Sequence, residues 1–238
     1  MIKKVFLLAL IVALTNCVSA QKKRPWVTPL YDGEPYHFGF AFSLGKMGFV
    51  VDHSDNFNAL DTVYAIEYSG GALFGASMIF NLKLADNLDL RTQPGLLFAQ
   101  RNLNYFLRDD KIPADKQLHK HDMKIESTLL QFPTSIKYRA IRESNYRPYL
   151  FCGLNPAIDL AARKKVAEEE KPKIKLKKFD VYAELGFGLD NYFTWFKYST
   201  EIKFSFGLLD MVNRDNTEYT QAFNRLGSKM ITLVLCFE

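Results

Sequence analysis

The fold is decided by the stretch Phe196-Lys-Tyr-Ser-Thr-Glu-Ile-Lys-Phe-Ser-Phe-Gly-Leu208, whose side chains alternate without a break. Every second position is aromatic, aliphatic or threonine, and the positions between them are charged or small. Because successive side chains of a β-strand point to opposite faces, this stretch predicts a strand with one apolar face and one charged face. The class of protein then depends on which of the two faces meets water.

The charged positions recur in other alternating segments and carry both signs. They are Asp89, Arg91, Lys137, Arg147, Asp180, Glu184, Asp190, Glu201 and Lys203. A Lys or Arg facing lipid at the middle of a bilayer costs about 2–4 kcal/mol, whereas opposite charges inside a barrel can pair. We therefore predict that these nine residues form a structural network of charges facing the lumen of a barrel.

Eight strand-like segments can be read along the chain, at roughly 36–51, 72–84, 88–105, 123–139, 146–162, 177–192, 196–210 and 228–237. The connections between them alternate: 52–71, 106–122, 163–176 and 211–227 are long, and 85–87, 140–145 and 193–195 are short. Outer-membrane barrels have long extracellular loops and short periplasmic turns, so this order places both termini in the periplasm. The predicted fold class is all-β: an eight-stranded antiparallel up-and-down transmembrane β-barrel, closed and filled by side chains.

Aromatic residues cluster beside the short connections. Tyr138, Tyr192, Trp195 and Phe196 are predicted to form a periplasmic aromatic girdle, because amphipathic rings prefer the boundary between lipid and water. The last segment alternates up to Phe237, which is typical of the closing strand of such barrels, although Glu238 follows the aromatic residue.

The first twenty residues read as a secretory signal peptide. Lys3 and Lys4 precede a short apolar run, and Val18-Ser19-Ala20 is a small-residue cleavage site. We expect a signal peptide over residues 1–20, a periplasmic N-terminal segment over 21–35 and the barrel domain over 36–238, located in the outer membrane of a Gram-negative cell after cleavage near Ala20. Removing two lysines lowers the net charge from +5 to +3, too weak a bias to indicate nucleic-acid binding.

A soluble lipocalin-like barrel is the alternative fold. It is also eight-stranded and antiparallel, but its apolar face lines a ligand cavity and its charges meet water. Alternation alone does not separate the two, and a signal peptide permits both. The alternation of long and short connections, the clustered aromatic residues and the closing strand favour the membrane barrel. The main environment of such a barrel is outer-membrane lipid.

Few residues suggest chemistry. His119 and His121 lie in or beside a long connection and could share one face of an extended segment, but two histidines without further ligands are weak evidence for a metal. His37 and Ser43, six residues apart on one strand, are about 20 Å from each other and cannot pair. We therefore expect no enzymatic activity, no cofactor, no metal and no small-molecule substrate.

Two further features are read as structural or as docking elements. The charge run at 163–178 is typical of a solvated extracellular loop, with a docking surface for another membrane component as the alternative. Cys152 and Cys236 are predicted to face opposite sides of the barrel wall, so we expect no disulfide between them.

Several segments, taken in order, resemble one known family. They are Glu126–Tyr138 with Asn145–Leu150 and Ile158–Ala161, then Asp180–Asp190, Glu201–Leu208 and Leu82–Gly95. Together they are similar to the PorT (SprT) family of outer-membrane barrels of the type IX secretion and gliding-motility system. Thr200 and Gln131 depart from the pattern, where Pro and Glu respectively are expected.

The resemblance implies a role in exporting proteins with C-terminal sorting signals, through contacts with other type IX secretion components, and implies no catalysis. A generic small structural or adhesive barrel is the alternative function, and a lipid-modifying barrel enzyme is a third. The sequence does not identify the secretion step.

Overall fold

A computed structural model describes residues 31–53, 63–108, 118–161, 177–212 and 223–238 of the chain. Within these ranges it describes the side chains except those of 51–53, 63–69, 103–108, 118–124 and 223. The predicted signal peptide and the charge run at 163–178 therefore lie wholly or mostly outside the described residues.

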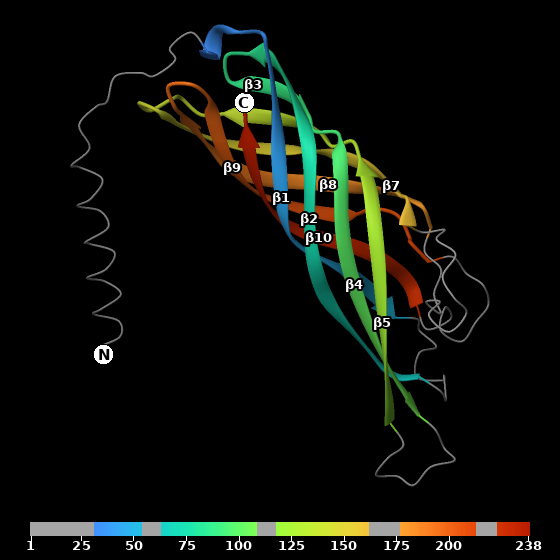
Figure 1. The fold of residues 1–238 in the computed structure, drawn as a ribbon. Coiled ribbons are helices and arrows are strands. Elements are labelled where there is room, and N and C mark those ends of the chain that lie inside the picture. The colour runs from blue at the N-terminus through green and yellow to red at the C-terminus, as the bar shows by residue number, and fades with distance from the viewer. Residues whose placement is uncertain (1–30, 54–62, 109–117, 162–176, 213–222) are drawn as a thin grey trace, which may run out of the picture.

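One antiparallel sheet curls into a closed ring (Figure 1). Its strands are β1 (Tyr36–His53), β2 (Val63–Ala85), β3 (Leu88–Thr92), β4 (Gly95–Arg108), β5 (Leu118–Gln131), β6 (Thr134–Arg139), β7 (Tyr146–Asp159), β8 (Phe179–Tyr192), β9 (Lys197–Gly207) and β10 (Phe223–Phe237). The ring closes because β1 pairs with β2 on one side and with β10 on the other.

The ten strand segments make up an eight-stranded barrel, because β3 and β4 are two parts of one strand and so are β5 and β6. Each break falls at a proline, Pro94 or Pro133, which has no N–H to donate to the ladder. The proline carbonyls still accept: Met78 N–H donates to Pro94 O at 2.9 Å, and Gln93 N–H donates to Pro133 O at 2.9 Å. The predicted eight-stranded antiparallel barrel is thus confirmed, and two of its eight strands are interrupted.

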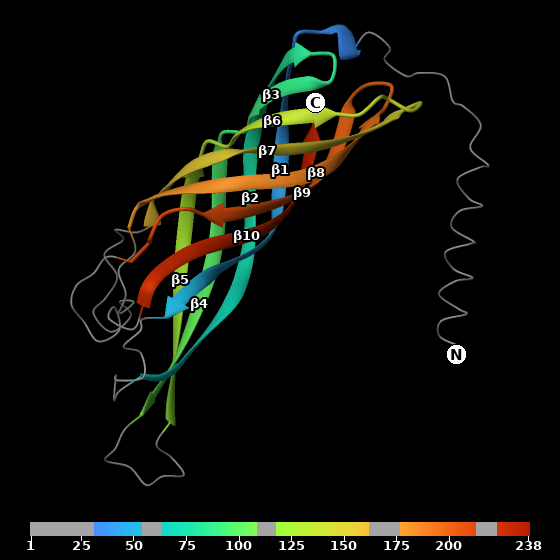
Figure 2. The same cartoon turned by 180° about the vertical axis from the view of Figure 1, so that it is seen from behind.

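The strands at the long-loop end differ from the predicted bounds. β2 begins at Val63 instead of 72, β5 at Leu118 instead of 123, and β10 at Phe223 instead of 228. Backbone pairing carries β2, β4 and β5 on through stretches where the apolar alternation weakens, and Figures 1 and 2 show these three strands projecting beyond the rest of the barrel. As a result His119 and His121 lie within β5, although their side chains are outside the described ones.

The two faces of the wall separate sharply by polarity. Large apolar side chains project outward, among them Phe38, Met78 and Leu150, each at least 61% exposed. Charged and polar side chains point inward, together with two small apolar clusters: one contains Met47, Leu73, Leu129 and Tyr182, and the other Ala41, Ile79, Val234 and Cys236. This is the reverse of a lipocalin-like barrel and fits a wall surrounded by hydrocarbon.

The outer band is apolar up to a clear boundary. Above it, toward the long-loop end, exposed Lys46, Glu126 and Lys229 point outward. Glu126 pairs in regular register with Gln100 and lies at the edge of the apolar band. In the part of the chain that the structure describes, no helix has the length and apolar character needed to cross a membrane.

Candidate functional site

The structure places all nine predicted lumen charges on the inner face of the wall. Each is at most 7% exposed. They come from β3, β6, β7, β8 and β9, and the alternation of each strand turns them toward the barrel axis. Their partners, however, are set by the stagger between strands and include residues outside the predicted set.

One network of buried charges in the lumen surrounds Arg91. Its guanidinium pairs with Glu201 and lies 2.6 Å from Glu238 Oε1, while Tyr149 OH donates to Glu201 at 2.7 Å. Lys197 Nζ lies 2.8 Å from the second oxygen of Glu238. The carboxylate of Glu238, the residue that departs from the usual aromatic end, therefore completes the network.

Glu201 and Lys203 belong to different ion pairs. Lys203 Nζ lies 3.5 Å from Glu184 and donates to Gln93 at 3.0 Å. Residues two apart on one strand share a face. Glu201 nevertheless meets Arg91 of β3 and Tyr149 of β7 across the lumen, whereas Lys203 meets Glu184 of the adjacent strand β8.

A second buried pair joins β6 to β8. Lys137 Nζ donates to both carboxylate oxygens of Asp190, at 2.9 and 3.0 Å, and Ser199 Oγ donates to the same carboxylate at 2.5 Å. The ammonium also lies 3.5 Å from the centre of the Tyr149 ring. The aromatic face supplies the favourable contact that water would otherwise give a buried cation.

The other predicted charges have separate surroundings. Asp89 lies 2.8 Å from Arg139, and Arg147 binds Asp32. Asp180 accepts from the backbone N–H groups of Val181 and Leu209. Toward the long-loop end, Arg101 contacts Asp159 at 3.5 Å and donates to Ser228 and Ser127.

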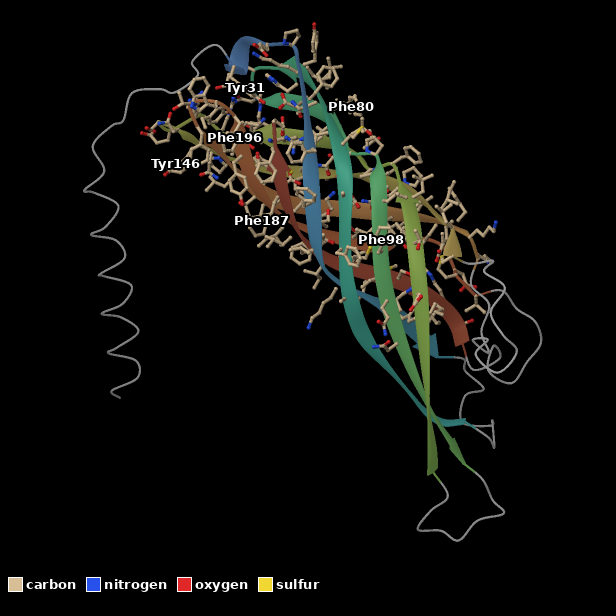
Figure 3. All side chains as sticks on the ribbon, viewed as in Figure 1. Tyr31, Phe80, Phe98, Tyr146, Phe187 and Phe196 are labelled. Atoms are coloured by element: carbon tan, nitrogen blue, oxygen red, sulfur yellow. The ribbon has the colours of Figure 1, made fainter. Side chains whose placement is uncertain are left out.

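The short-turn end is closed by a residue from before the barrel. The 3₁₀ turn η1 (Tyr31–Gly33) inserts Asp32 among the side chains of Arg139, Arg142, Arg147 and Tyr192. Figure 3 shows Tyr31 at the same end of the barrel as Tyr146 and Phe196. The last residues of the segment 21–35, which is predicted to be a periplasmic segment before the barrel domain, therefore line the lumen at this end.

The electrostatics of this end favour a charged Asp32. Burial acts to raise the pKa of Asp32, but hydrogen bonds from Tyr192 and Arg142 and the positive charges of Arg147 and Arg142 outweigh it. The pKa of Asp32 consequently lies below its ordinary value.

Three of the four predicted girdle residues lie on the outer surface. Tyr138 is 57% exposed, Trp195 is 91% exposed and Phe196 is 44% exposed. Tyr192 is only 4% exposed and donates to Asp32 at 2.8 Å, so its assignment to the girdle is wrong. The parity of β8 explains this, because Tyr192 shares a face with inward Asp190.

Sequence reasoning missed several residues of the network. They are Asp32, Arg101, Arg139, Arg142 and Glu238, each a partner in an ion pair described above. Arg139 lies two residues after Lys137 in the same strand and therefore on the same face, so the alternation of the sequence could have identified it. Asp32 and Arg142 lie outside the alternating segments, so the sequence carries no comparable signal for them.

The interior offers little room for chemistry. A cavity beside Glu184 and Lys203 has a volume of about 10 Å³, room for about one water molecule. Among the described residues, no group of three or more His, Cys, Asp or Glu side chains is arranged to hold a metal ion. Cys152 is exposed on the outer face and Cys236 is buried in the lumen, and both are free thiols.

The chain belongs to the outer membrane protein beta-barrel domain family, whose model matches residues 20–213. This agrees with the closed ring, the apolar outer band and the charged lumen. The family supports a location in the outer membrane.

Solved structures of small outer-membrane barrels are similar to this chain. Neisserial surface protein A is 12% identical, with 85% of this chain and 98% of that chain covered and a TM-score of 0.39. The N-terminal β-barrel domain of OprF from Pseudomonas aeruginosa is 13% identical, with 84% and 96% covered and a TM-score of 0.35. OprG from the same organism is 13% identical, with 84% and 94% covered and a TM-score of 0.41. No curated protein sequence matches the chain.

Proposed function

We propose that this barrel is a non-enzymatic component of type IX protein secretion, which supports the export of proteins with C-terminal sorting signals and, in gliding organisms, surface motility. It acts through contacts with other secretion components in the outer membrane. The resemblance of its ordered strand motifs to the PorT family supports this role, and membership of the outer-membrane barrel family is consistent with it.

The filled lumen is the observation that carries the proposal. Arg91, Lys137, Glu201 and Asp190 are paired across the interior and each is at most 3% exposed. A barrel of eight strands is just wide enough for side chains to fill it, so a client protein does not pass through it. A role in export then has to be exerted through surfaces of the barrel.

A clean deletion of the gene tests the proposal. We expect loss of client proteins from the medium and the cell surface, restored by the wild-type gene on a plasmid. Normal secretion in the deletion strain would rule out the proposal and favour a generic structural or adhesive barrel. Changed lipid A in the mass spectrum of the same strain, with secretion intact, would favour a lipid-modifying enzyme instead.

A further inference from the structure

We propose that the short-turn end of the barrel is a preformed receptor for a carboxylate next to an aromatic ring. Asp32 and Tyr31 of this chain occupy it in the resting state, and an acidic, aromatic-containing segment of a periplasmic partner protein takes their place. The inference goes beyond the proposed secretion role and does not depend on it.

Three donors converge on the carboxylate of Asp32 from different parts of the barrel. Arg147 Nη1 donates to Oδ1 at 3.0 Å, and Arg142 Nη1 donates to Oδ2 at 3.1 Å. Tyr192 OH donates to Oδ1 at 2.8 Å. Both oxygens are therefore bound by charge-assisted hydrogen bonds, which are about twice as strong as neutral ones.

The two arginines are held in place by the turns of the barrel and not only by Asp32. Arg147 Nε donates to Ala140 O at 2.8 Å, and its Nη2 donates to Asp86 O at 2.9 Å. Arg142 Nε donates to Ser144 O at 2.9 Å, and its guanidinium lies 3.7 Å from the centre of the Tyr192 ring. When Asp32 leaves, these contacts keep the remaining N–H groups pointed at the same place, so the site is pre-organised for another carboxylate.

The occupant is a small unit that can leave without disturbing the sheet. Asp32 lies in a single 3₁₀ turn with one internal hydrogen bond, from Glu34 N–H to Tyr31 O, at 3.3 Å. Only Glu34 and Pro35 join this turn to β1, and the β1 ladder with β2 begins at Tyr36. Exchange of the turn breaks the hydrogen bond from Lys83 Nζ to Asp32 O, at 2.9 Å, but none of the pairings between β1 and β2.

The neighbouring ring defines the chemistry of the partner. Tyr31 stacks on His37 with ring centroids 4.0 Å apart and an angle of 5° between the planes, and it meets the edge of Tyr192 at 5.9 Å. Lys197 Nζ lies 5.0 Å from the centre of the Tyr31 ring. A ligand that fills the whole site thus needs an aromatic ring beside its carboxylate, which a peptide supplies and a free phosphate ion does not.

The first experiment empties the site and adds the occupant back. The purified full-length barrel carrying Tyr31→Ala and Asp32→Ala is titrated with the fluorescent peptide Leu-Tyr-Asp-Gly-Glu-Pro, which is the sequence of residues 30–35. We expect saturable binding at least about tenfold tighter than to the wild-type barrel, because an occupied site lowers apparent affinity by the fraction of molecules that are free. A gel shift on heating confirms that each variant is folded.

Two matched controls define the contacts. The same peptide with Asn in place of Asp should bind at least about tenfold more weakly, since it loses the charged contact. Adding Arg147→Gln to the emptied barrel should have the same effect. Equal binding of the Asp and Asn peptides, or no binding by a folded emptied barrel, would overturn the proposal. Equally effective competition by inorganic phosphate would overturn the aromatic requirement.

The second experiment tests exchange in the intact site. A Cβ at Gly33 has nothing within 4 Å, so Gly33→Cys with a spin label should leave the turn in place, in a background where Cys17 and Cys152 are Ser. Excess peptide should convert the label to a mobile spectrum. An unchanged spectrum at concentrations that saturate the emptied barrel would show that Asp32 and Tyr31 do not exchange.

Discussion

At the scale of single residues, the lumen behaves as a set of buried ion pairs in which each side chain matters through its partner. Burying two charges offers little net stabilisation, but removing one of them leaves the other uncompensated, which is strongly unfavourable. Glu201 is the clearest case, because it accepts from Arg91 and from Tyr149 and is 2% exposed.

We therefore expect Glu201→Gln to destabilise the barrel by about 3–5 kcal/mol, and by less where water in the lumen screens Arg91. The measurement is the midpoint of unfolding in urea, followed by the gel shift of the folded form. Glu126→Gln is the matched control, because Glu126 is exposed on the outer face and should leave the midpoint unchanged. Equal midpoints for the two variants would contradict the assignment of Glu201 to the network around Arg91.

Asp32 is a second single residue on which the stability of the barrel should depend, and its contribution should vary with pH. The groups that face it are Arg139, Arg142, Arg147 and Tyr192, while Lys83 binds its backbone carbonyl and His37 lies beside it under Tyr31. Because the pKa of Asp32 is lowered on folding, its contribution is present above the unfolded value, which is about 3.9, and is lost as the pH falls through the lower folded value.

The stability difference between wild type and Asp32→Asn should accordingly stay constant from neutral pH down to about pH 5 and then shrink below about pH 4. Unfolding in urea at several pH values measures it, with the difference between the two proteins cancelling the titration of the other carboxylates. A difference that vanishes near neutral pH would contradict the lowered pKa.

At the scale of strands, glycines in β8 make room for the aromatic rings of β7. Gly188 faces Tyr149 across the ladder, and a Cβ there would lie 2.4 Å from that ring. Gly186 faces Phe151 in the same way, at 2.5 Å. The rings can lie flat over the neighbouring strand, which lets Tyr149 reach Glu201 and cover Lys137.

Gly188→Ala should destabilise the barrel by about 1–3 kcal/mol, because the Tyr149 ring has to move away from its two partners. Gly227→Ala is a suitable control, since a Cβ there meets its nearest atom at 3.7 Å, an ordinary contact. The unfolding midpoint of each variant is compared with that of wild type. If Gly188→Ala matched the control, the ring would have another position open to it.

The same scale shows what the sequence could predict. Alternation along each strand assigns a face to residues such as Glu201 and Lys137, because the period of a strand is two and holds whatever the neighbours are. The partner of each charge depends on how the strands are staggered and curled into the barrel. The contacts of Arg91 with Glu201 and Glu238 could therefore not be predicted from the sequence. Asp32 was missed for another reason: a residue outside the strands has no periodicity to place it.

At the scale of the whole molecule, the two ends of the barrel are built differently. The short-turn end is filled by Asp32 and Glu238, and the C-terminal end of the chain lies there (Figure 1). At the opposite end β2, β4 and β5 run on past the apolar band (Figure 2). A strand needs only about 9–11 residues to cross a bilayer, so β2, from Val63 to Ala85, extends well beyond it.

This asymmetry fixes an orientation that can be measured on cells. Short turns lie on the periplasmic side of outer-membrane barrels. Asp86 lies in the β2–β3 turn and its side chain is 96% exposed. A cysteine in its place should react with a membrane-impermeant maleimide only after the outer membrane is permeabilised. An epitope inserted within 163–178, the predicted extracellular loop, should be detected on intact cells. The background carries Cys152→Ser, because Cys152 is the exposed thiol of the described residues. Labelling of Asp86→Cys on intact cells, with the epitope hidden, would show the inverse orientation and would move the carboxylate receptor to the cell surface.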